Sequence, residues 1–153
     1  MHLWIIAIGK MKKGSEEELI LRRYIQRCQW PIEVIELEEK KKLPVAELKR
    51  KEGALLLNAV PKGAKIVVLD ENGTEPNSEH FAERLMKWAE NGTRDIAFLI
   101  GGANGHSSEV KGKADLLLSF GRMTLPHMLM RSVLSEQLYR AYTIAQHQPY
   151  HKE

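Results

Sequence analysis

Residues 96–105 read Ile-Ala-Phe-Leu-Ile-Gly-Gly-Ala-Asn-Gly, a continuous apolar run followed by a glycine-rich turn. A strand without polar alternation is typical of a parallel sheet that helices cover on both faces, because neither face of such a strand meets water. Similar apolar, β-branched runs recur at 3–8, 32–37 and 65–69, with longer amphipathic stretches between them. This alternation predicts an α/β fold, with a mostly parallel sheet and helices on both faces.

Helix signals fill the stretches between these runs. Ser15 is well placed as an N-cap, since three glutamates follow it, and Pro44 and Pro126 are favourable at a helix start. Helices are therefore expected over about 15–29, 44–58, 78–91 and 127–146, with a short helical turn near 107–113. An apolar run at 116–118 lies between that turn and the last helix.

The chain has 153 residues, of which 43% are hydrophobic and 28% charged, so its composition is that of a globular protein and not of a disordered or fibrous one. At this length a single domain over residues 1–153 is expected. The only cysteine, Cys28, cannot form an internal disulfide and has no C-x-x-C partner, so we expect it to pack in the core. A lone thiol also favours a reducing compartment, and we expect a cytoplasmic location.

Basic residues are concentrated in the first half of the chain. Residues 1–65 carry 14 basic and 9 acidic side chains, whereas the rest carries 9 and 11. Lysine and arginine gather at 10–13, 40–42 and 49–51. These clusters would attract a polyanion such as nucleic acid, although solvated lysines on exposed faces also explain them. The apolar opening at 3–8 is too short to span a membrane, and no membrane association is expected.

The glycine-rich turn at 101–105 lies at the strand end where open α/β sheets bind ligands. Its spacing does not fit G-x-G-x-x-G, and no G-K-[ST] follows, so neither a dinucleotide fingerprint nor a phosphate-binding P-loop is indicated. A ligand-binding loop and an ordinary tight turn both remain open.

Two carboxylates, Asp70 and Glu71, end the third apolar run and precede Asn72-Gly73, a pair that favours a turn. They could serve a binding site or simply form the turn, and the sequence leaves both open. The histidines form no H-E-x-x-H pair and have no cysteine partners, so no metal site is expected.

The chain ends in Gln-Pro-Tyr-His-Lys-Glu, residues 148–153. Tyr150, His151 and Lys152 bring together an aromatic ring, an imidazole and an ammonium, which suit base stacking, proton transfer and phosphate contact. Glu136 and Arg140 add charge to the helix before this tail. An ion pair four residues apart along a helix accounts for those two charges on structural grounds alone.

Four sequence blocks together resemble the ribosomal large-subunit RNA methyltransferase H family. The blocks are Leu99–Gly102, Met123–His127, Glu136–Ala141 and Pro149–Lys152. The resemblance covers essentially the whole chain and includes the Val-Leu-Asp at the third strand. The sequence departs from the pattern at Ala103-Asn104, where some members have a proline and a different second residue.

The resemblance implies a SPOUT-type α/β domain with a C-terminal trefoil knot, an S-adenosylmethionine site formed by the knotted loops, and a homodimer. The general rule that chains do not knot would instead predict an unknotted flavodoxin-like sheet. The positions that match the family's methyl-donor pocket are Leu69, Gly101, Phe120, Gly121, Arg122, Met123, Thr124 and Leu125.

The reaction that the resemblance implies is methyl transfer from S-adenosylmethionine to N3 of pseudouridine 1915, in helix 69 of 23S rRNA, on assembled ribosomes. No metal is needed. We expect His151 to assist loss of the N3 proton and Tyr150 to position the base. Lys152, Arg140 and Arg131 are expected to meet phosphates or the developing base anion.

Three alternatives stand beside this interpretation. One is a SPOUT methyltransferase that acts on another RNA such as tRNA. A second is a ribosome-binding factor that has the fold but no chemistry. The third, which the residues alone would favour, is a nicotinamide or flavin enzyme on a doubly wound sheet, although its glycine fingerprint is missing.

Overall fold

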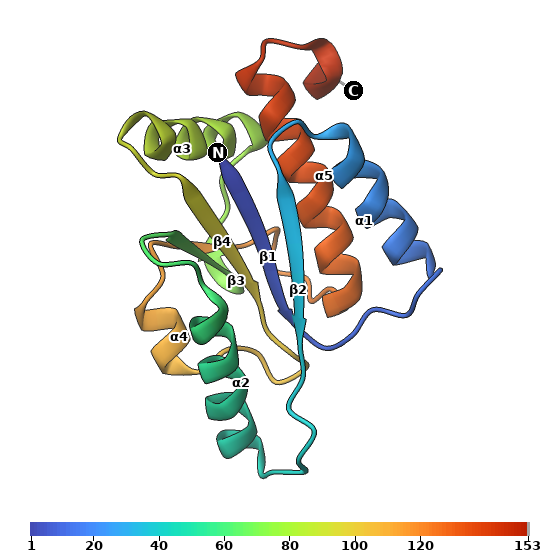
Figure 1. Cartoon of the computed structure of the whole chain (residues 1–153), viewed down its shortest axis with the longest axis vertical. Coiled ribbons are helices and arrows are strands. Elements are labelled where there is room, and N and C mark those ends of the chain that lie inside the picture. The colour runs from blue at the N-terminus through green and yellow to red at the C-terminus, as the bar shows by residue number, and fades with distance from the viewer. Residues whose placement is uncertain (153) are drawn as a thin grey trace.

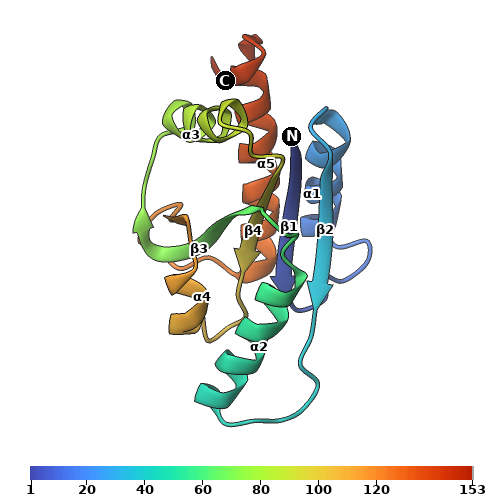
Figure 2. The same cartoon turned by 60° about the vertical axis from the view of Figure 1, so that its left-hand side comes forward.

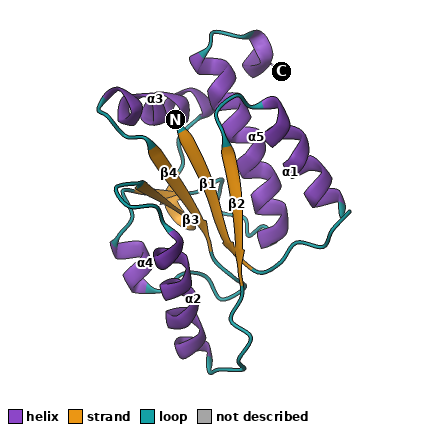
Figure 3. Cartoon of the chain, viewed as in Figure 1, coloured by secondary structure: helices purple, strands orange, loops and turns teal. Residues whose placement is uncertain are grey.

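The computed structural model describes residues 1–152 and contains one five-stranded sheet. The strands are β1 (His2–Ile8), β2 (Ile32–Leu37), β3 (Lys65–Thr74), β4 (Asp95–Ile100) and β5 (Leu116–Leu118). Their order in the sheet is β2-β1-β4-β3-β5, and every neighbouring pair is parallel. Figure 3 shows the sheet at the centre of the molecule with helices around it.

Helices cover both faces of the sheet, as predicted. They are α1 (Glu16–Arg27), α2 (Val45–Ala59), α3 (Ser78–Glu90), α4 (Ser108–Gly112) and α5 (His127–Ala145), with a final 3-10 turn, η1 (Pro149–Lys152). Residues of α1, α3 and α5 pack against one face, and residues of α2 and α4 against the other. Figures 1 and 2 show α1 and α5 side by side on one side of the sheet and α2 near α4 on the other.

The continuous apolar strands are explained by two hydrophobic layers. Along β1, Leu3 and Ile5 point into the layer under α1, α3 and α5, whereas Ile6 and Ile8 point into the layer under α2 and α4. All four side chains are buried. Because successive side chains of a strand face opposite sides, a strand between two helical layers needs apolar residues at every position.

Local signals place the first helix where the sequence predicts it. The Ser15 hydroxyl accepts a hydrogen bond from the Glu18 backbone N–H at 3.3 Å, as an N-cap does. At the other end, Cys28 is the C-cap and is buried in the core. Burial raises the pKa of its thiol to about 11, so it stays protonated at neutral pH. The expectation that Cys28 packs in the core is confirmed.

The edge strand β5 differs from the sequence prediction, since only an apolar run was recognised there. At three residues it lies at the lower limit of strand length, and so short a run is too brief for periodicity to identify it. Its partner β3 extends to Thr74, through the pair predicted to form a turn. A Cβ atom on Gly73 would lie 2.6 Å from the Leu117 carbonyl carbon and oxygen. Gly73 is therefore needed for close approach of two backbones.

The segment between β5 and α5 is fastened to the end of β3. The Ser119 backbone N–H donates to the Thr74 carbonyl at 2.8 Å, and the Ser119 hydroxyl donates to the Glu71 carbonyl at 3.1 Å. The Thr124 hydroxyl donates to the Glu71 carboxylate at 3.0 Å. These bonds place residues 119–124 across the carboxyl end of the sheet. Within residues 1–152, no helix is both long and apolar enough to cross a membrane.

Candidate functional site

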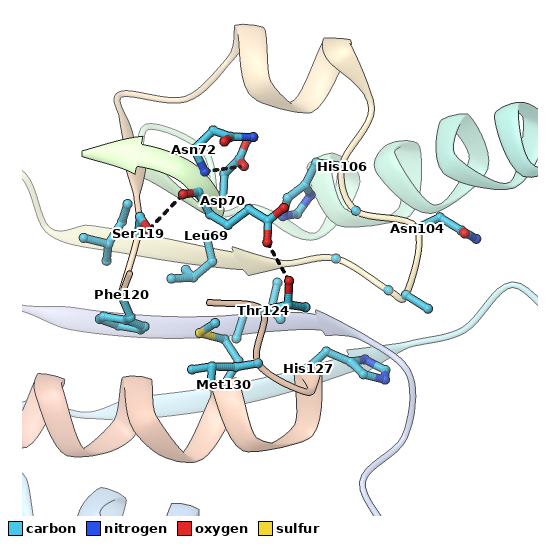
Figure 4. A pocket seen from close by; sticks show the side chains of 18 of the residues that line it. Leu69, Asp70, Asn72, Asn104, His106, Ser119, Phe120, Thr124, His127 and Met130 are labelled. Carbon is cyan, nitrogen blue, oxygen red and sulfur yellow. Dashed lines mark hydrogen bonds between the residues drawn. The ribbon is translucent and has the colours of Figure 1, made fainter. Parts of the chain in front are cut away.

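A cavity of about 700 Å³ lies at the carboxyl end of β3 and β4 (Figure 4). Its walls come from residues 69–72 in the second half of β3, the glycine-rich turn after β4, the segment 119–126 and the first turn of α5. This size falls in the range of small-molecule sites, and the edge of the sheet is the one where open α/β folds bind ligands. The glycine-rich turn is thus part of a cavity wall.

Most residues that match the family's methyl-donor pocket line this cavity. They are Leu69, Gly101, Phe120, Gly121, Met123, Thr124 and Leu125. Arg122 is exposed and does not line it. Met123 lies at the rim and is 85% exposed. The cavity therefore has apolar walls, formed by leucine and phenylalanine side chains, beside backbone of two glycine-containing loops.

The glycine-rich turn is closed on itself. The Gly105 backbone N–H donates to the Gly102 carbonyl at 3.0 Å, and Gly105 has a φ of +77°, which favours glycine. A Cβ on Gly101 would lie 3.2 Å from the Gly105 backbone, and one on Gly102 would lie 3.3 Å from both carboxylate oxygens of Glu52. Side chains at 101 and 102 would thus press on their surroundings, and the backbone borders the cavity directly.

Both carboxylates in the second half of β3, Asp70 and Glu71, line the cavity, so they do more than form a turn. Burial opposes ionisation of Asp70, but the Asn72 backbone N–H and the Lys111 ammonium outweigh it and lower the pKa of this carboxyl. The Lys111 Nζ lies 3.3 Å from the Asp70 carboxylate. Glu71 accepts the hydrogen bond from Thr124 described above. The two acids therefore hold cavity walls together as well as facing the cavity.

Sequence reasoning missed His106, which follows the glycine-rich turn and lines the cavity. Its side chain is buried, and neither ring nitrogen has a hydrogen-bond partner in the described part of the chain. Burial lowers the pKa of His106, and the nearby Asp70 carboxylate offsets this only in part. The ring is therefore neutral at physiological pH. Its position directly after the glycine-rich turn is the sequence feature that could have identified it as a cavity residue. Lys49, Lys111 and His127 also line the cavity. The basic cluster at 49–51 and the block Met123–His127 had marked the first and the last of these, whereas no sequence pattern marked Lys111.

The C-terminal tail packs on α5. The Tyr150 hydroxyl donates to the Glu136 carboxylate at 2.8 Å, and Arg140 Nη2 donates to the same oxygen at 2.6 Å. The Arg140 guanidinium also lies 4.8 Å from the centre of the Tyr150 ring, a cation–π distance. Burial, with Tyr24 and Glu136, raises the pKa of Tyr150, and the bond to Glu136 raises that of Arg140. Both keep their protons at neutral pH.

The tail histidine has a defined tautomer. The Nδ1 atom of His151 lies 2.8 Å from the Gln148 carbonyl oxygen, which can only accept a hydrogen bond. In the neutral ring Nδ1 therefore carries the proton, and Nε2 has a free lone pair. Lys152 is exposed beside it.

The cavity and the tail lie at different levels of α5. His127 and Met130 line the cavity, whereas Glu136, which binds Tyr150, lies six residues beyond Met130. At 1.5 Å per residue this is about 9 Å along the helix axis. Figure 1 shows the tail at the far end of α5 from its first turn. One chain therefore does not bring its tail to its own cavity.

The structure contradicts the expectation that Arg131 meets phosphates or a base anion. Arg131 is 0% exposed, and its guanidinium lies 2.6 Å from the Glu36 carboxylate. It also donates to the carbonyls of Ile8 and Gly9 at 2.8 and 2.9 Å. Burial lowers the pKa of Arg131, and Glu36 offsets only part of this shift. Its role is structural, because it ties α5 to the ends of β1 and β2.

The lysine clusters 10–13 and 40–42 follow the carboxyl ends of β1 and β2, and their lysines are exposed. In α2, Lys49 lines the cavity itself. Since parallel strands end at one edge, clusters that are far apart in the sequence lie on the edge that holds the cavity.

Comparison with known proteins identifies the family. Residues 1–151 match a family model described as predicted SPOUT methyltransferase. The chain is 51% identical over 152 residues to the ribosomal RNA large subunit methyltransferase H of Paramagnetospirillum magneticum, and 49% identical over 152 residues to that of Rhodospirillum centenum. It is 43% identical over 154 residues to that of Hyphomonas neptunium. Each match covers 99% of both chains. The chain therefore belongs to the knotted SPOUT methyltransferases and, among them, to the ribosomal RNA large subunit methyltransferase H family.

Proposed function

We propose that this chain transfers a methyl group from S-adenosylmethionine to N3 of pseudouridine 1915, in helix 69 of 23S rRNA on the assembled ribosome. It does so in the cytoplasm, as a homodimer. Membership of the SPOUT family implies a methyl donor of this type, and the relatives' name concerns large-subunit rRNA. The observation that carries the proposal is the pairing of a glycine-lined cavity with a Tyr-His-Lys tail at another level of the same helix.

The cavity fits the donor in size and in chemistry. Leu69, Phe120 and Leu125 offer apolar surface to an adenine ring, and the backbone at Gly101 and Gly121 can approach the ligand closely. When bound, S-adenosylmethionine supplies a methyl group that is activated by its sulfonium charge. The residues of the cavity bind and orient the donor and exclude water, so that most of the rate comes from alignment of the two reactants. The reaction needs no metal.

The tail supplies the groups for the base. The free Nε2 of His151 accepts the N3 proton, because its tautomer is fixed by the bond to Gln148. Arg140 stays charged beside Glu136 and stabilises the anion that forms as the proton leaves. The Tyr150 ring positions the base, and Lys152 contacts phosphate.

The homodimer follows from the same geometry. Reacting atoms must come within roughly 3–3.5 Å, whereas Tyr150 is held at Glu136, about 9 Å along α5 beyond Met130, where the cavity wall ends. A second copy can place its tail at the cavity of the first. The separation of cavity and tail in one chain therefore supports a site shared between two protomers.

The basic clusters at 10–13 and 40–42 provide the docking surface for rRNA. They lie at the cavity edge, and two protomers would double them. Phosphate contacts of this kind position a substrate without reading its sequence, so the surrounding ribosome can select the nucleotide.

The first experiment measures methyl incorporation from labelled S-adenosylmethionine into ribosomes that lack the modification, beside free 23S rRNA and tRNA, with mapping of the product. Label at pseudouridine 1915 in ribosomes alone is the expected result. Label in tRNA would assign the chain to another SPOUT substrate. Tight ribosome binding without label would identify a non-catalytic factor.

A second experiment tests the shared site by mixing two inactive variants. His151→Ala removes the proton acceptor, and Gly101→Val disturbs the cavity loop, where a Cβ already lies 3.2 Å from the Gly105 backbone. In a mixture that exchanges protomers, half the dimers are mixed and each has one intact site, so activity returns to about a quarter of wild type. No recovery, with exchange confirmed by mass spectrometry, would refute the shared site.

A further inference from the structure

Three arginines of α1 take no part in the mechanism described above. Arg22, Arg23 and Arg27 are exposed, and within residues 1–152 none of them forms a salt bridge with a carboxylate. Their charges can therefore attract an anion that binds from outside the chain.

A row of aromatic rings connects the last turn of α1 to the tail. The Arg27 guanidinium lies 6.0 Å from the centre of the Tyr24 ring, and that ring lies 5.8 Å from the ring of Tyr139 on α5. The Tyr139 ring packs edge-on against Tyr150, with the ring centres 4.8 Å apart. Figure 1 shows the end of α1 and the tail at the same end of α5.

Two of the three arginines share one side of α1. At 3.6 residues per turn, Arg23 and Arg27 are only about 40° apart around the helix, and Arg27 is about 60° from Tyr24. Arg22 is about 160° from Tyr24 and points to the other side of the helix. We call Arg23, Tyr24 and Arg27, together with Tyr150 and Lys152 of the tail, the α1–tail surface.

This surface is separate from the lysine clusters at the cavity edge. The cluster 10–13 precedes the first residue of α1, Glu16, whereas Arg27 is its last residue, about 17 Å further along the helix axis. A cation in the last turn also suits the helix dipole, but that explanation covers Arg27 and not Arg23. Glu136 does not neutralise these arginines, because it is already bound by Arg140 and Tyr150.

The chemistry of the surface fits unpaired RNA. Methylation at N3 requires an unpaired target, because N3 lies on the pairing edge of the base, and a base must leave its stack to react. Proteins hold unpaired nucleotides with cations for the phosphates beside aromatic rings for the bases. In a site shared between protomers, the α1 that accompanies the tail approaches the same RNA as the tail.

We propose that the α1–tail surface is a second RNA-binding surface, whose Arg23 and Arg27 contact backbone phosphates of the unpaired nucleotides next to the target base. The inference rests on the proposed function, since it takes rRNA as the substrate and the tail as the part that meets the base. It adds phosphate contacts close to the reacting nucleotide to those that the lysine clusters make at the cavity edge.

Binding and methylation of ribosomes that lack the modification test the proposal. The double variant Arg23→Gln, Arg27→Gln is expected to bind ribosomes roughly tenfold more weakly, with the slope of log affinity against log salt reduced by about two, one per lost phosphate contact. The KM for ribosomes rises in parallel, whereas kcat and the Kd for S-adenosylmethionine stay unchanged, because the lost contacts act on substrate binding alone.

The matched control removes equal charge from elsewhere on the surface. Arg22→Gln, Lys87→Gln changes one cation on the other side of α1 and one exposed cation on α3, and it leaves all these values at the wild-type level. Equal weakening in the control, or wild-type affinity in the double variant, would overturn the proposal. Wild-type protein that neither bound nor methylated ribosomes would instead refute the proposed function, and this inference with it.

Photo-crosslinking tests the position of the surface on the RNA. The only cysteine of the wild type, Cys28, is buried, so a thiol-directed azide reagent labels Arg23→Cys at the new position. Crosslinks to 23S rRNA nucleotides next to the methylated position are expected, and none from Lys87→Cys on α3. Crosslinks to a distant part of the rRNA would contradict the placement beside the target base. Crosslinks to ribosomal protein alone would show that the surface binds a protein and not RNA.

Discussion

The two ends of α5 are built in different ways. At its first turn the cavity is framed by strand ends and glycine backbone, and Arg131 buries its guanidinium against Glu36 to hold the helix there. At its far end the tail is a single 3-10 turn held through side chains, with one carboxylate, Glu136, receiving both Tyr150 and Arg140. We infer that the donor site belongs to one chain, whereas the groups for the base are attached to α5 apart from that site.

The largest expected effect comes from a mutation that disables the tail at one end of α5 and leaves the cavity at the other end intact. His151→Ala should lower kcat by about 10²–10⁴-fold, the usual contribution of a general base, and leave the Kd for S-adenosylmethionine unchanged. Single-turnover methylation of ribosomes and calorimetry with the donor measure the two quantities. A matched His80→Ala should alter neither, because His80 is exposed on α3.

A lower affinity of His151→Ala for the donor would contradict this contrast between the two ends of α5, since it would mean that the tail also shapes the cavity. Retention of full kcat would remove His151 from the chemistry. Its Nε2 would then be a surface lone pair with no part in proton transfer.

The second effect concerns the anchor of the cavity end. Arg131→Met removes the buried cation, and the carbonyls of Ile8 and Gly9 lose their donor. Breaking one partner of a buried pair costs about 3 kcal/mol or more, so the free energy of unfolding should fall by at least that amount. Urea denaturation followed by circular dichroism measures it.

Arg84→Met is the control for this loss. Arg84 is exposed on α3 and lies 5.1 Å from the Trp88 ring, so its removal should cost less than about 1 kcal/mol. A loss in Arg131→Met no larger than in this control would show that the ion pair does not anchor α5.

A smaller effect is expected at the basic edge. Replacing Lys40, Lys41 and Lys42 with glutamate should weaken ribosome binding roughly tenfold and reduce the slope of log affinity against log salt by about two. Filter binding over a series of salt concentrations gives both values. The same reversal at Lys62, Lys87 and Arg94 alters equal charge away from the cavity edge, and an equal change there would argue against local docking.

The fold was predictable because its rules are local. Apolar runs at successive positions required a doubly covered sheet, and Ser15 capped the first helix as its hydroxyl allows. The knot was not predictable from these patterns, because periodicity reports which face of an element is buried and not the path of the chain. The family resemblance supplied it, and the family comparison bears it out.

The parts of the site that the backbone forms were predictable from the sequence. The parts that depend on the orientation of side chains were less so. Seven of the eight expected donor-pocket residues line the cavity, but Arg122 does not, since position in a loop does not tell which side faces the cavity. Arg131 was misjudged because a buried arginine and an exposed one look alike in sequence. The distance between tail and cavity emerged only from the length and direction of α5.

The smallest expected effect is on the pH dependence of the free energy of unfolding, where His106 and the acids around it act in different pH ranges. Its folded pKa lies below the unfolded value of 6.5, so between that folded value and 6.5 the unfolded chain binds a proton that the native chain does not. Stability should therefore fall as pH drops below 6.5, by at most about 1.4 kcal/mol per pH unit. Asp70 has a lowered folded pKa, so its stabilising contribution persists until the pH falls below about 4, the unfolded value.

Urea denaturation of wild type and His106→Leu from pH 7.5 to 5 should show a decline in the free energy of unfolding only in wild type. An equal decline in both would assign the acid sensitivity to other groups and would mean that the cavity end accommodates a charged imidazole.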